Sequence, residues 1–204
     1  MPSKPKMFSY RQVEEAVRSL HDVPPERLAT FRARVRNFQK LNLILSSPGK
    51  GQRISYSIFD AVQWALCFEF AELGLGPELT AWLLLKVLFL FLAAFNPEGQ
   101  DGDWIFWLRG DLFSRYLARA GLYTELECGV KPASRVAEAA FAPDKPGRVL
   151  MVNFSKLKRD LGKALDFEWG HDRDALQSAF LEWIDLNIPS LLKGFEVEPD
   201  DDVD

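Results

Sequence analysis

Residues 79–95 are the segment that most restricts how this chain can fold. The run LTAWLLLKVLFLFLAAF is 17 residues long, and its one charged side chain is Lys86. A membrane-spanning helix needs about 20 apolar residues, and no basic flank anchors this run on either side. We therefore expect a helix that protein buries on every side, and no membrane span.

Covering such a helix is difficult for a chain of this size. One bare face would expose on the order of several hundred Å² of apolar surface, more than soluble monomers usually tolerate. The sequence therefore predicts a homodimer that buries the helix across a two-fold axis. The alternative is that two β-prone runs, Trp104–Leu108 and Arg148–Phe154, cover it within one chain.

Composition is typical of globular domains and calls for no cofactor. Of the 204 residues 48% are hydrophobic, and the two cysteines lie 61 positions apart without histidine neighbours. We expect two domains, 8–95 and 104–195, with a turn-rich linker between them and a disordered acidic tail at 196–204. The N-terminus has no apolar signal-peptide region, so we expect a cytoplasmic protein.

The positive charge of this acidic chain is concentrated in its first quarter. Residues 1–56 hold eleven Lys or Arg against four Asp or Glu, a net charge of +7. The whole chain has a net charge of −4, which leaves −11 on the other 148 residues. A polyanionic partner is the simplest physical reason for this division. The alternative is a basic helix face that is merely solvated.

Two helices are expected near the N-terminus. Ser9 is a suitable N-cap for a helix over Tyr10–Leu20, whose apolar residues recur at helical spacing. Pro25 suits the first turn of a second helix that runs through about Lys40. One face of that helix carries an apolar stripe, and its other faces carry five cations. The stripe consists of Leu28, Phe31, Val35 and Phe38.

A β-hairpin and a third helix are expected next, before the apolar one. Leu41–Leu45 and Gln52–Tyr56 are β-prone runs joined by a Pro-Gly turn, which predicts a hairpin with a basic tip. Ser57 and Asp60 have the spacing of a helix cap, and Gly74 is suited to end that helix.

The second half of the chain is expected to be a small α+β region. Its candidate strands are Trp104–Leu108, Leu122–Val130, Arg135–Phe141 and Arg148–Phe154. Helices are predicted over Asp174–Leu186 and, with Ser155 as the cap, through Leu165, whereas Asp111–Gly121 is ambiguous. The fold class is therefore mainly α with a small amount of β structure (α+β).

Four short motifs occur in order between residues 8 and 95. They are Phe8-Ser-Tyr10 with Val13, Gly51-Gln-Arg53-Ile-Ser-Tyr56, Asp60-Ala-Val, and Glu72-Leu-Gly-Leu-Gly-Pro-Glu78. Together they resemble the winged helix-turn-helix of the MerR-like transcriptional regulators, whose wing has a Gly-x-Arg-x-x-Tyr pattern. The second half of the chain lacks that family's long heptad repeat and metal-sensing cysteines, so the resemblance extends to DNA binding and not to the mode of sensing.

The resemblance implies a sequence-specific regulator of bacterial or phage transcription that binds double-stranded DNA in the nucleoid, with RNA polymerase or another regulatory protein as a further partner. A major groove admits one helix, which agrees with a basic second helix. Three groups of residues are expected to contact DNA. The base readers are Arg27, Thr30, Arg34 and Asn37, the phosphate contacts are Arg32, Arg36 and Lys40, and the wing contacts are Lys50, Gln52 and Arg53.

No catalytic motif accompanies these residues. The sequence has no nucleophile elbow, no phosphate-binding glycine loop and no H-E-x-x-H motif, and His21 and His171 stand apart. We therefore expect neither an enzyme nor a metal site. The alternative function is a protein–protein interaction module, in which the basic face of a winged-helix scaffold docks on an acidic protein surface.

Overall fold

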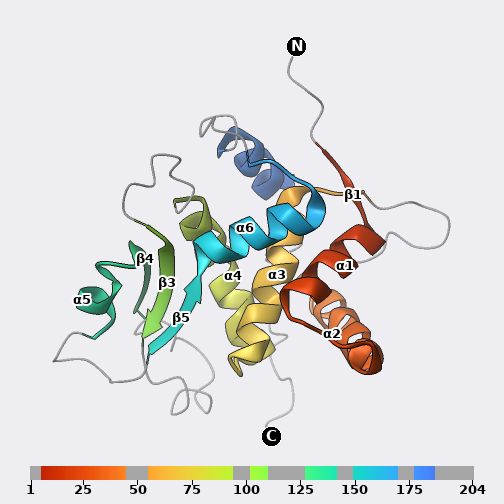
Figure 1. Ribbon diagram of the computed structural model, residues 1–204, viewed down its shortest axis with the longest axis horizontal. Helices are drawn as coiled ribbons and strands as arrows, with labels where there is room; N and C mark the ends of the chain where they lie inside the picture. The colour runs from red at the N-terminus through yellow and green to blue at the C-terminus, as the bar shows by residue number, and fades with distance from the viewer. Residues whose placement is uncertain are drawn as a thin grey trace, which may run out of the picture. The chain divides into compact units, whose positions relative to one another are not determined.

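Over its described residues the chain folds into helices and two small antiparallel sheets, as the computed structural model in Figure 1 shows. This confirms the mixed α+β class. The structure describes residues 6–44, 55–93, 102–109, 127–141, 149–169 and 177–186. The chain has two compact units: Met1–Leu85 with Asp160–Asp204, and Lys86–Arg159. The expected domains, 8–95 and 104–195, stay a prediction. The compact unit that holds the N-terminal helices also holds the residues from Asp160 onward.

The first helix, α1, spans Tyr10–Leu20 as predicted. Ser9 is its N-cap: the backbone N–H of Gln12 donates to the Ser9 hydroxyl, and the Gln12 side chain accepts from the Ser9 backbone N–H. This reciprocal capping box satisfies two donors that a helix start leaves unpaired. The short strand β1, Phe8–Ser9, leads directly into the helix.

The second helix begins with one turn of 3-10 helix, Pro25–Arg27, and continues as α2, Leu28–Lys40. The predicted stripe is confirmed at Phe31, Val35 and Phe38, which are all buried, whereas Leu28 is partly exposed. Phe31 stacks on Phe68 of α3 with ring centroids 4.5 Å apart, and Phe38 meets the same ring edge-on at 5.3 Å. These contacts determine which side of α2 is turned inward.

The first arm of the predicted hairpin is not a strand over the residues that the structure describes. Asn42 has a positive φ of 54°, and the Leu43 N–H donates to the Phe38 carbonyl, which makes this run the end of α2. Asparagine tolerates this left-handed conformation well, so the helix stop outweighs the β propensity of its neighbours. The strand β2, Ser55–Tyr56, pairs instead with β1.

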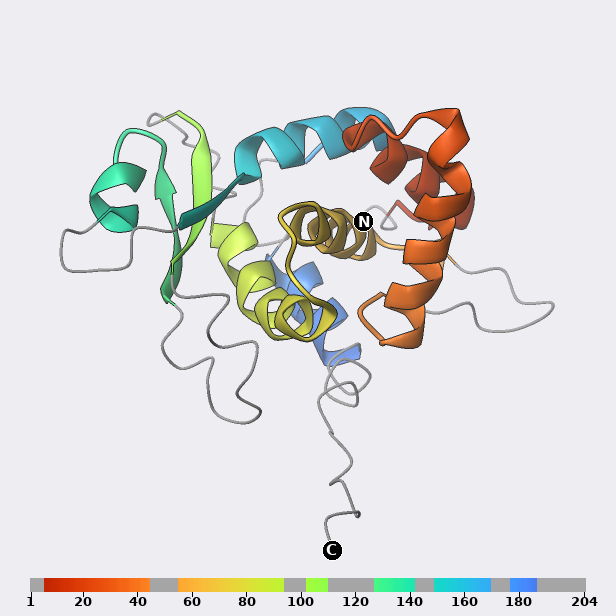
Figure 2. The ribbon, with the colours of Figure 1, turned by 90° about the horizontal axis from the view of Figure 1, so that it is seen from below.

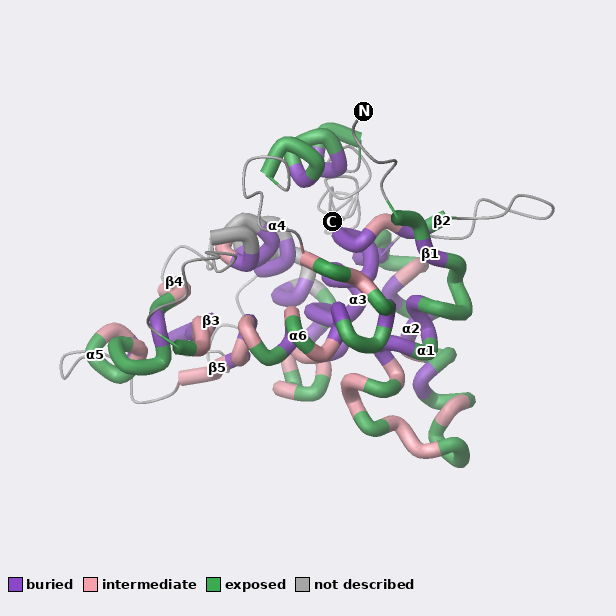
Figure 3. The backbone as a smooth tube through the Cα atoms, turned by 45° about the horizontal axis from the view of Figure 1, so that its top comes forward, coloured by how far each residue is buried: buried purple, intermediate pink, exposed green. Residues whose placement is uncertain are grey.

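The third helix, α3, spans Ile58–Glu72 and forms the centre of this unit. Ser57 and Asp60 form the predicted capping box, and Gly74 follows the helix with a φ of +78°. In Figure 3 most of α3 is coloured as buried, whereas α2 alternates between buried and exposed residues. The predicted core position of Cys67 is confirmed, and burial raises the pKa of its thiol.

A further helix over 177–186 packs against the start of α3. The Trp183 indole N–H donates to Oδ1 of Asp60 at 2.8 Å, and Phe180 contacts Phe59 with ring centroids 5.2 Å apart. The Asp60 carboxylate is buried, and its other oxygen caps α3 through Ser57. One buried carboxylate therefore holds both the start of α3 and a helix more than 120 residues away.

The apolar segment forms helix α4, Pro77–Ala93. Its described side chains are almost all buried within a single copy of the chain: Leu79, Thr80, Leu83, Leu84, Val87, Leu88 and Phe91. Among the described residues, no helix is long and apolar enough to cross a membrane. These side chains are covered without a second copy of the chain. The homodimer predicted from this segment therefore stays a prediction.

The second unit contains a three-stranded antiparallel sheet, which Figure 2 shows with its strands side by side. The central strand is β3, Trp104–Arg109, and its neighbours are β4, Glu127–Pro132, and β5, Val149–Asn153. Phe106 of β3 stacks on Phe154, which begins the helix after β5. The predicted strands Trp104–Leu108 and Arg148–Phe154 are thus confirmed at Trp104–Leu108 and Val149–Asn153, whereas Phe154 belongs to the following helix.

The predicted strand over Arg135–Phe141 is wrong. Val136–Ala140 is a short helix, α5, and the Arg109 guanidinium donates to its Ala139 carbonyl. Its residues are Val-Ala-Glu-Ala-Ala, and alanine has the highest intrinsic helix propensity. The apparent alternation of apolar and polar residues there was too short to distinguish a strand from one helical turn.

Helix α6 spans Phe154–Leu165 and begins two residues earlier than predicted. Its N-cap is Asn153 rather than Ser155: Oδ1 of Asn153 accepts from the Lys156 N–H at 2.8 Å. The Asn153 amide also donates to Asp103, which pairs with Arg159 at 2.6 Å. These hydrogen bonds lower the pKa of Asp103 to about 2. The Ser155 hydroxyl accepts instead from the Trp104 N–H.

The end of α6 folds back on itself. Asp166 has a positive φ of 48°, and the Phe167 N–H donates to the Gly162 carbonyl at 2.8 Å. A Cβ at Gly162 would lie 2.5 Å from Nε1 of Trp169 and 2.9 Å from the Phe167 carbonyl oxygen. Phe167 in turn contacts Phe8 of β1, so this turn joins α6 to the first strand.

Several expected elements lie outside the described residues. They are the hairpin tip at 45–54, the linker at 96–101, the ambiguous segment Asp111–Gly121 and the acidic tail at 196–204.

We predict that Gly162→Ala destabilises the protein, although the same change in an open helix adds about 1 kcal/mol of stability. The new methyl group has no room beside Trp169, and overpacking of this kind costs about 1–3 kcal/mol. Urea unfolding measures the difference. Ser19→Ala, at an exposed position of α1, is the control and should be neutral or slightly stabilising. An unchanged or higher stability for Gly162→Ala would mean that Trp169 does not pack on this glycine.

We also predict that Trp183→Phe destabilises the protein in a pH-dependent way. Losing the indole donor leaves Oδ1 of the buried Asp60 unpaired, at a cost of about 1–3 kcal/mol. Burial already raises the pKa of Asp60 above its usual 3.8, and the Trp183 hydrogen bond opposes that shift. A raised folded pKa means that stability falls as pH rises through it.

The variant should therefore lose more stability than the parent as pH rises above about 4, the usual pKa of an aspartate. Urea unfolding at a series of pH values gives the difference. Phe180→Leu is the matched control, because it weakens the same helix contact without touching Asp60 and should shift stability equally at every pH. A Trp183→Phe profile parallel to the parent's would contradict the coupling.

Candidate nucleic-acid interface

The outward face of α2 is opposite the side that packs on Phe68. Because 3.6 residues make one turn, the exposed positions form a continuous strip. This strip, here called the α2 face, consists of Ala29, Thr30, Ala33, Arg36, Asn37 and Lys40, all of them exposed. Two alanines lie along its middle, so a partner can approach the helix backbone closely there.

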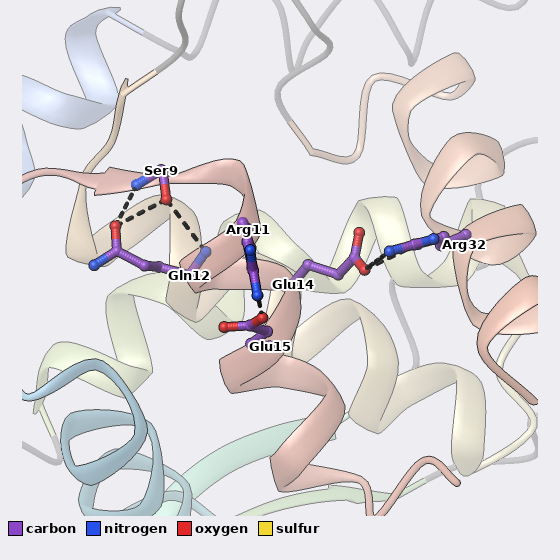
Figure 4. A network of polar contacts seen from close by, with 6 residues as sticks. All are labelled: Ser9, Arg11, Gln12, Glu14, Glu15 and Arg32. Atoms are coloured by element: carbon purple, nitrogen blue, oxygen red, sulfur yellow. Dashed lines mark hydrogen bonds and ion pairs between the residues drawn. The ribbon is translucent and has the colours of Figure 1, made fainter. Parts of the chain in front are cut away.

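Arg32 lies at one border of the α2 face and is bound to α1. Its Nε and Nη2 atoms donate to Oε1 of Glu14 at 2.9 and 2.7 Å, as Figure 4 shows. The Glu14 carboxylate is buried, with only 8% of the side chain exposed, whereas half of the Arg32 side chain is exposed. A buried carboxylate needs such a partner. The pair therefore attaches α2 to α1.

Burial and a neighbouring charge raise the pKa of Tyr10. Tyr10 lies at the start of α1, against Trp64 and Tyr56. Burial, followed by the charge of Glu14, raises the pKa of Tyr10 to about 12, and the nearby Arg32 and Arg36 oppose this shift. Tyr10 is thus a neutral hydroxyl beside the positive border of α2.

Arg34 lies at the other border and is bound to α3. Its Nη1 atom is 2.5 Å from Oε1 of Glu72, and both side chains are about half exposed. From its position in the sequence, Arg34 was predicted to read bases. The structure turns it toward the end of α3, so it lies beside the α2 face rather than on it.

Three cations of the expected set keep no acidic partner among the described residues. They are Arg27, Arg36 and Lys40, each exposed to solvent. Arg36 and Lys40 belong to the α2 face together with Thr30 and Asn37, whereas Arg27 precedes the helix. The face therefore has two cations, an amide and a hydroxyl around two methyl groups.

The expected wing cannot be placed in the same way. Lys50, Gln52 and Arg53 lie outside the described residues, and the only described part of the hairpin's second arm is Ser55–Tyr56. The pairing of that arm with β1 brings the residues after the wing next to the start of α1.

Sequence reasoning missed two features of this site. The first is the alanine pair, which an i, i+4 spacing on the exposed side of α2 would have indicated. The second is the pairing of Arg32 and Arg34 with distant acids. No local pattern signals these pairs, because Glu14 and Glu72 are 18 and 38 residues away from their partners.

Among the described residues of this unit, the remaining polar groups do not form a metal-binding cluster. His21 is partly buried against Phe68, with ring centroids 5.6 Å apart, and burial lowers its pKa. In the part of the chain that the structure describes, no group of three His, Cys, Asp or Glu side chains is arranged to hold a metal ion. His171 lies outside that part.

Comparisons with known proteins do not add a family to this description. No protein-family model matches the chain, and a search of curated proteins found no match.

We predict that Glu14→Gln lowers the melting temperature by about 2–4 °C. The substitution keeps the shape of the side chain and removes the charge that the Arg32 fork binds. The matched control is Glu15→Gln on the next residue, which removes an exposed i,i+4 pair with Arg11 and should change the melting temperature little. Equal effects of the two substitutions would mean that the Glu14–Arg32 pair does not hold α2 against α1.

Proposed function

We propose that this protein binds double-stranded DNA through the α2 face, as a winged helix-turn-helix regulator of transcription. The observation that carries the proposal is the composition of that face. Among the described residues its cations, Arg36 and Lys40, have no acidic partner, and two exposed alanines lie between its polar side chains. The +7 charge of residues 1–56 supplies the long-range attraction to a polyanion.

The chemistry of the face suits a major groove. Arginine and lysine bind guanine edges or phosphates, asparagine pairs with adenine, and alanine contacts the methyl group of thymine. The two alanines let the backbone of α2 approach the base edges. In this proposal Asn37 and Thr30 read bases, Arg36 and Lys40 contact phosphates or guanine, and Arg32 and Arg34 position the helix.

Two features of the sequence complete the proposal. The basic segment that contains Lys50, Gln52 and Arg53 would contact the DNA backbone beside the groove. A homodimer would present two α2 faces to half-sites one helical turn apart. RNA polymerase or another regulatory protein would then be a further partner.

An acidic protein surface is the alternative partner. It is favoured by the engagement of Arg32 and Arg34 in ion pairs, because that leaves fewer free cations on α2 for phosphates. A salt titration distinguishes the two functions, because a DNA-binding protein binds duplex DNA at low salt and loses affinity as salt rises. Counterion release predicts that log binding constant falls against log salt concentration with a slope of about −0.9 per neutralised phosphate.

We predict that Arg36→Ala with Lys40→Ala weakens binding to mixed-sequence duplex DNA about tenfold or more at low salt. The slope of log binding constant against log salt concentration should become less negative by about 1.8, because two phosphate contacts are lost. Fluorescence anisotropy over a salt series measures both. Lys131→Ala with Arg135→Ala removes the same charge from exposed positions of the second unit and should change little. Equal losses for both double variants would contradict the assignment to the α2 face, and no binding by the parent protein would favour the alternative partner.

A further inference from the structure

The C-terminal end of the chain carries a second charge extreme, opposite in sign to the first. Residues 196–204, here called the acidic segment, have the sequence EVEPDDDVD, with six carboxylates and no base. Residues 1–56, which include the α2 face, are the most basic part of the chain. Two oppositely charged parts of one chain attract each other, and they can meet if the chain between them is long enough.

The last described element before the acidic segment is the helix over 177–186. The helix over 177–186 is held against α3 by the buried hydrogen bond between Trp183 and Asp60 and by the contact between Phe180 and Phe59. Trp183, Phe180 and Ile184 are all buried. The chain that leads to the acidic segment therefore leaves from the same compact unit that contains α1, α2 and α3.

The length of the chain allows contact with the α2 face. Eighteen residues follow Leu186, and at about 3.3 Å per residue they reach up to about 60 Å. A compact unit of about 130 residues has a radius of gyration of about 14 Å. Glu196 lies ten residues after Leu186 and reaches about 33 Å, whereas Asp204 reaches the full length, so the segment can extend across a unit of this size. A short tether keeps the local concentration of the segment at about the millimolar level.

We propose that the acidic segment binds the α2 face of its own chain and competes with DNA for Arg36 and Lys40. This proposal rests on the proposed DNA-binding function, since it names the regulation of that same face. The carboxylates replace the phosphates as partners of the two cations. The segment acts as a built-in competitor whose strength falls as salt screens its charges.

The competition has a defined effect on affinity. If the segment covers the face for nine-tenths of the time, the apparent Kd for DNA is about tenfold weaker than that of the open face. Binding of DNA then displaces the segment from cations that it had already neutralised. Fewer counterions are released, so the parent protein should show a shallower salt slope than a protein without the charges of the segment.

The first test neutralises the segment in the full chain, with E196Q, E198Q, D200N, D201N, D202N and D204N combined. Its affinity for mixed-sequence duplex DNA should be at least about threefold higher than the parent's at low salt, and the two should converge near about 0.5 M salt. The control carries the same nine residues in permuted order and should behave as the parent. Equal affinities of the parent and the neutralised protein at low salt would overturn the proposal.

The second test does not involve DNA, so its failure is distinguishable from failure of the proposed function. A carbodiimide that joins a carboxylate directly to an amine should link the acidic segment to Lys40, and mass spectrometry of the digested monomer identifies the linked peptides. Lys40→Arg keeps the charge but should abolish this link. Links from the segment only to other lysines, or no link at all, would contradict binding at the α2 face even if DNA binding is confirmed.

Discussion

The orientation of α2 depends on the ring of Phe68 in the middle of α3. Phe31 stacks on this ring at 4.5 Å and Phe38 meets it edge-on at 5.3 Å, although the two residues lie nearly two helical turns apart along α2. Two contacts with one fixed ring define the rotation of a helix about its axis, because side chains on the opposite side are then directed to solvent. The α2 face, its two cations and its alanine pair all follow from that rotation.

The borders of the face are set by electrostatics rather than by packing. Glu14 holds Arg32 from the side of α1, and Glu72 holds Arg34 from the side of α3. The two pairs neutralise the positive charge at the borders, whereas the cations of the α2 face between them stay unpaired among the described residues. The Glu14 pair contributes more to the position of α2, because its carboxylate is buried and depends on the guanidinium, whereas the Arg34 pair is screened by solvent.

The same unit also holds the helix over 177–186 in place. Asp60 caps α3 with one oxygen and accepts from Trp183 with the other, so the helix over 177–186 is tied to the helix that carries Phe68. A buried carboxylate with satisfied hydrogen bonds specifies one arrangement, since an alternative docking would leave it unpaired. In the proposed regulation, this contact ensures that the acidic segment starts from the unit that binds DNA.

Local signals in the sequence determined most of the helices. Ser9 and Ser57 mark helix starts, Gly74 marks a helix end, and the stripe at Phe31, Val35 and Phe38 identifies the buried side of α2, because caps and periodicity act within a few residues. The sequence also determined that residues 1–56 are basic. The tertiary structure decided the rest: Asn42 ends α2 where β-prone residues suggested a strand, and the short run over 136–140 became a helix. It also decided which arginines of α2 are engaged and which are free, because their acidic partners belong to other helices and meet them only after the chain has folded.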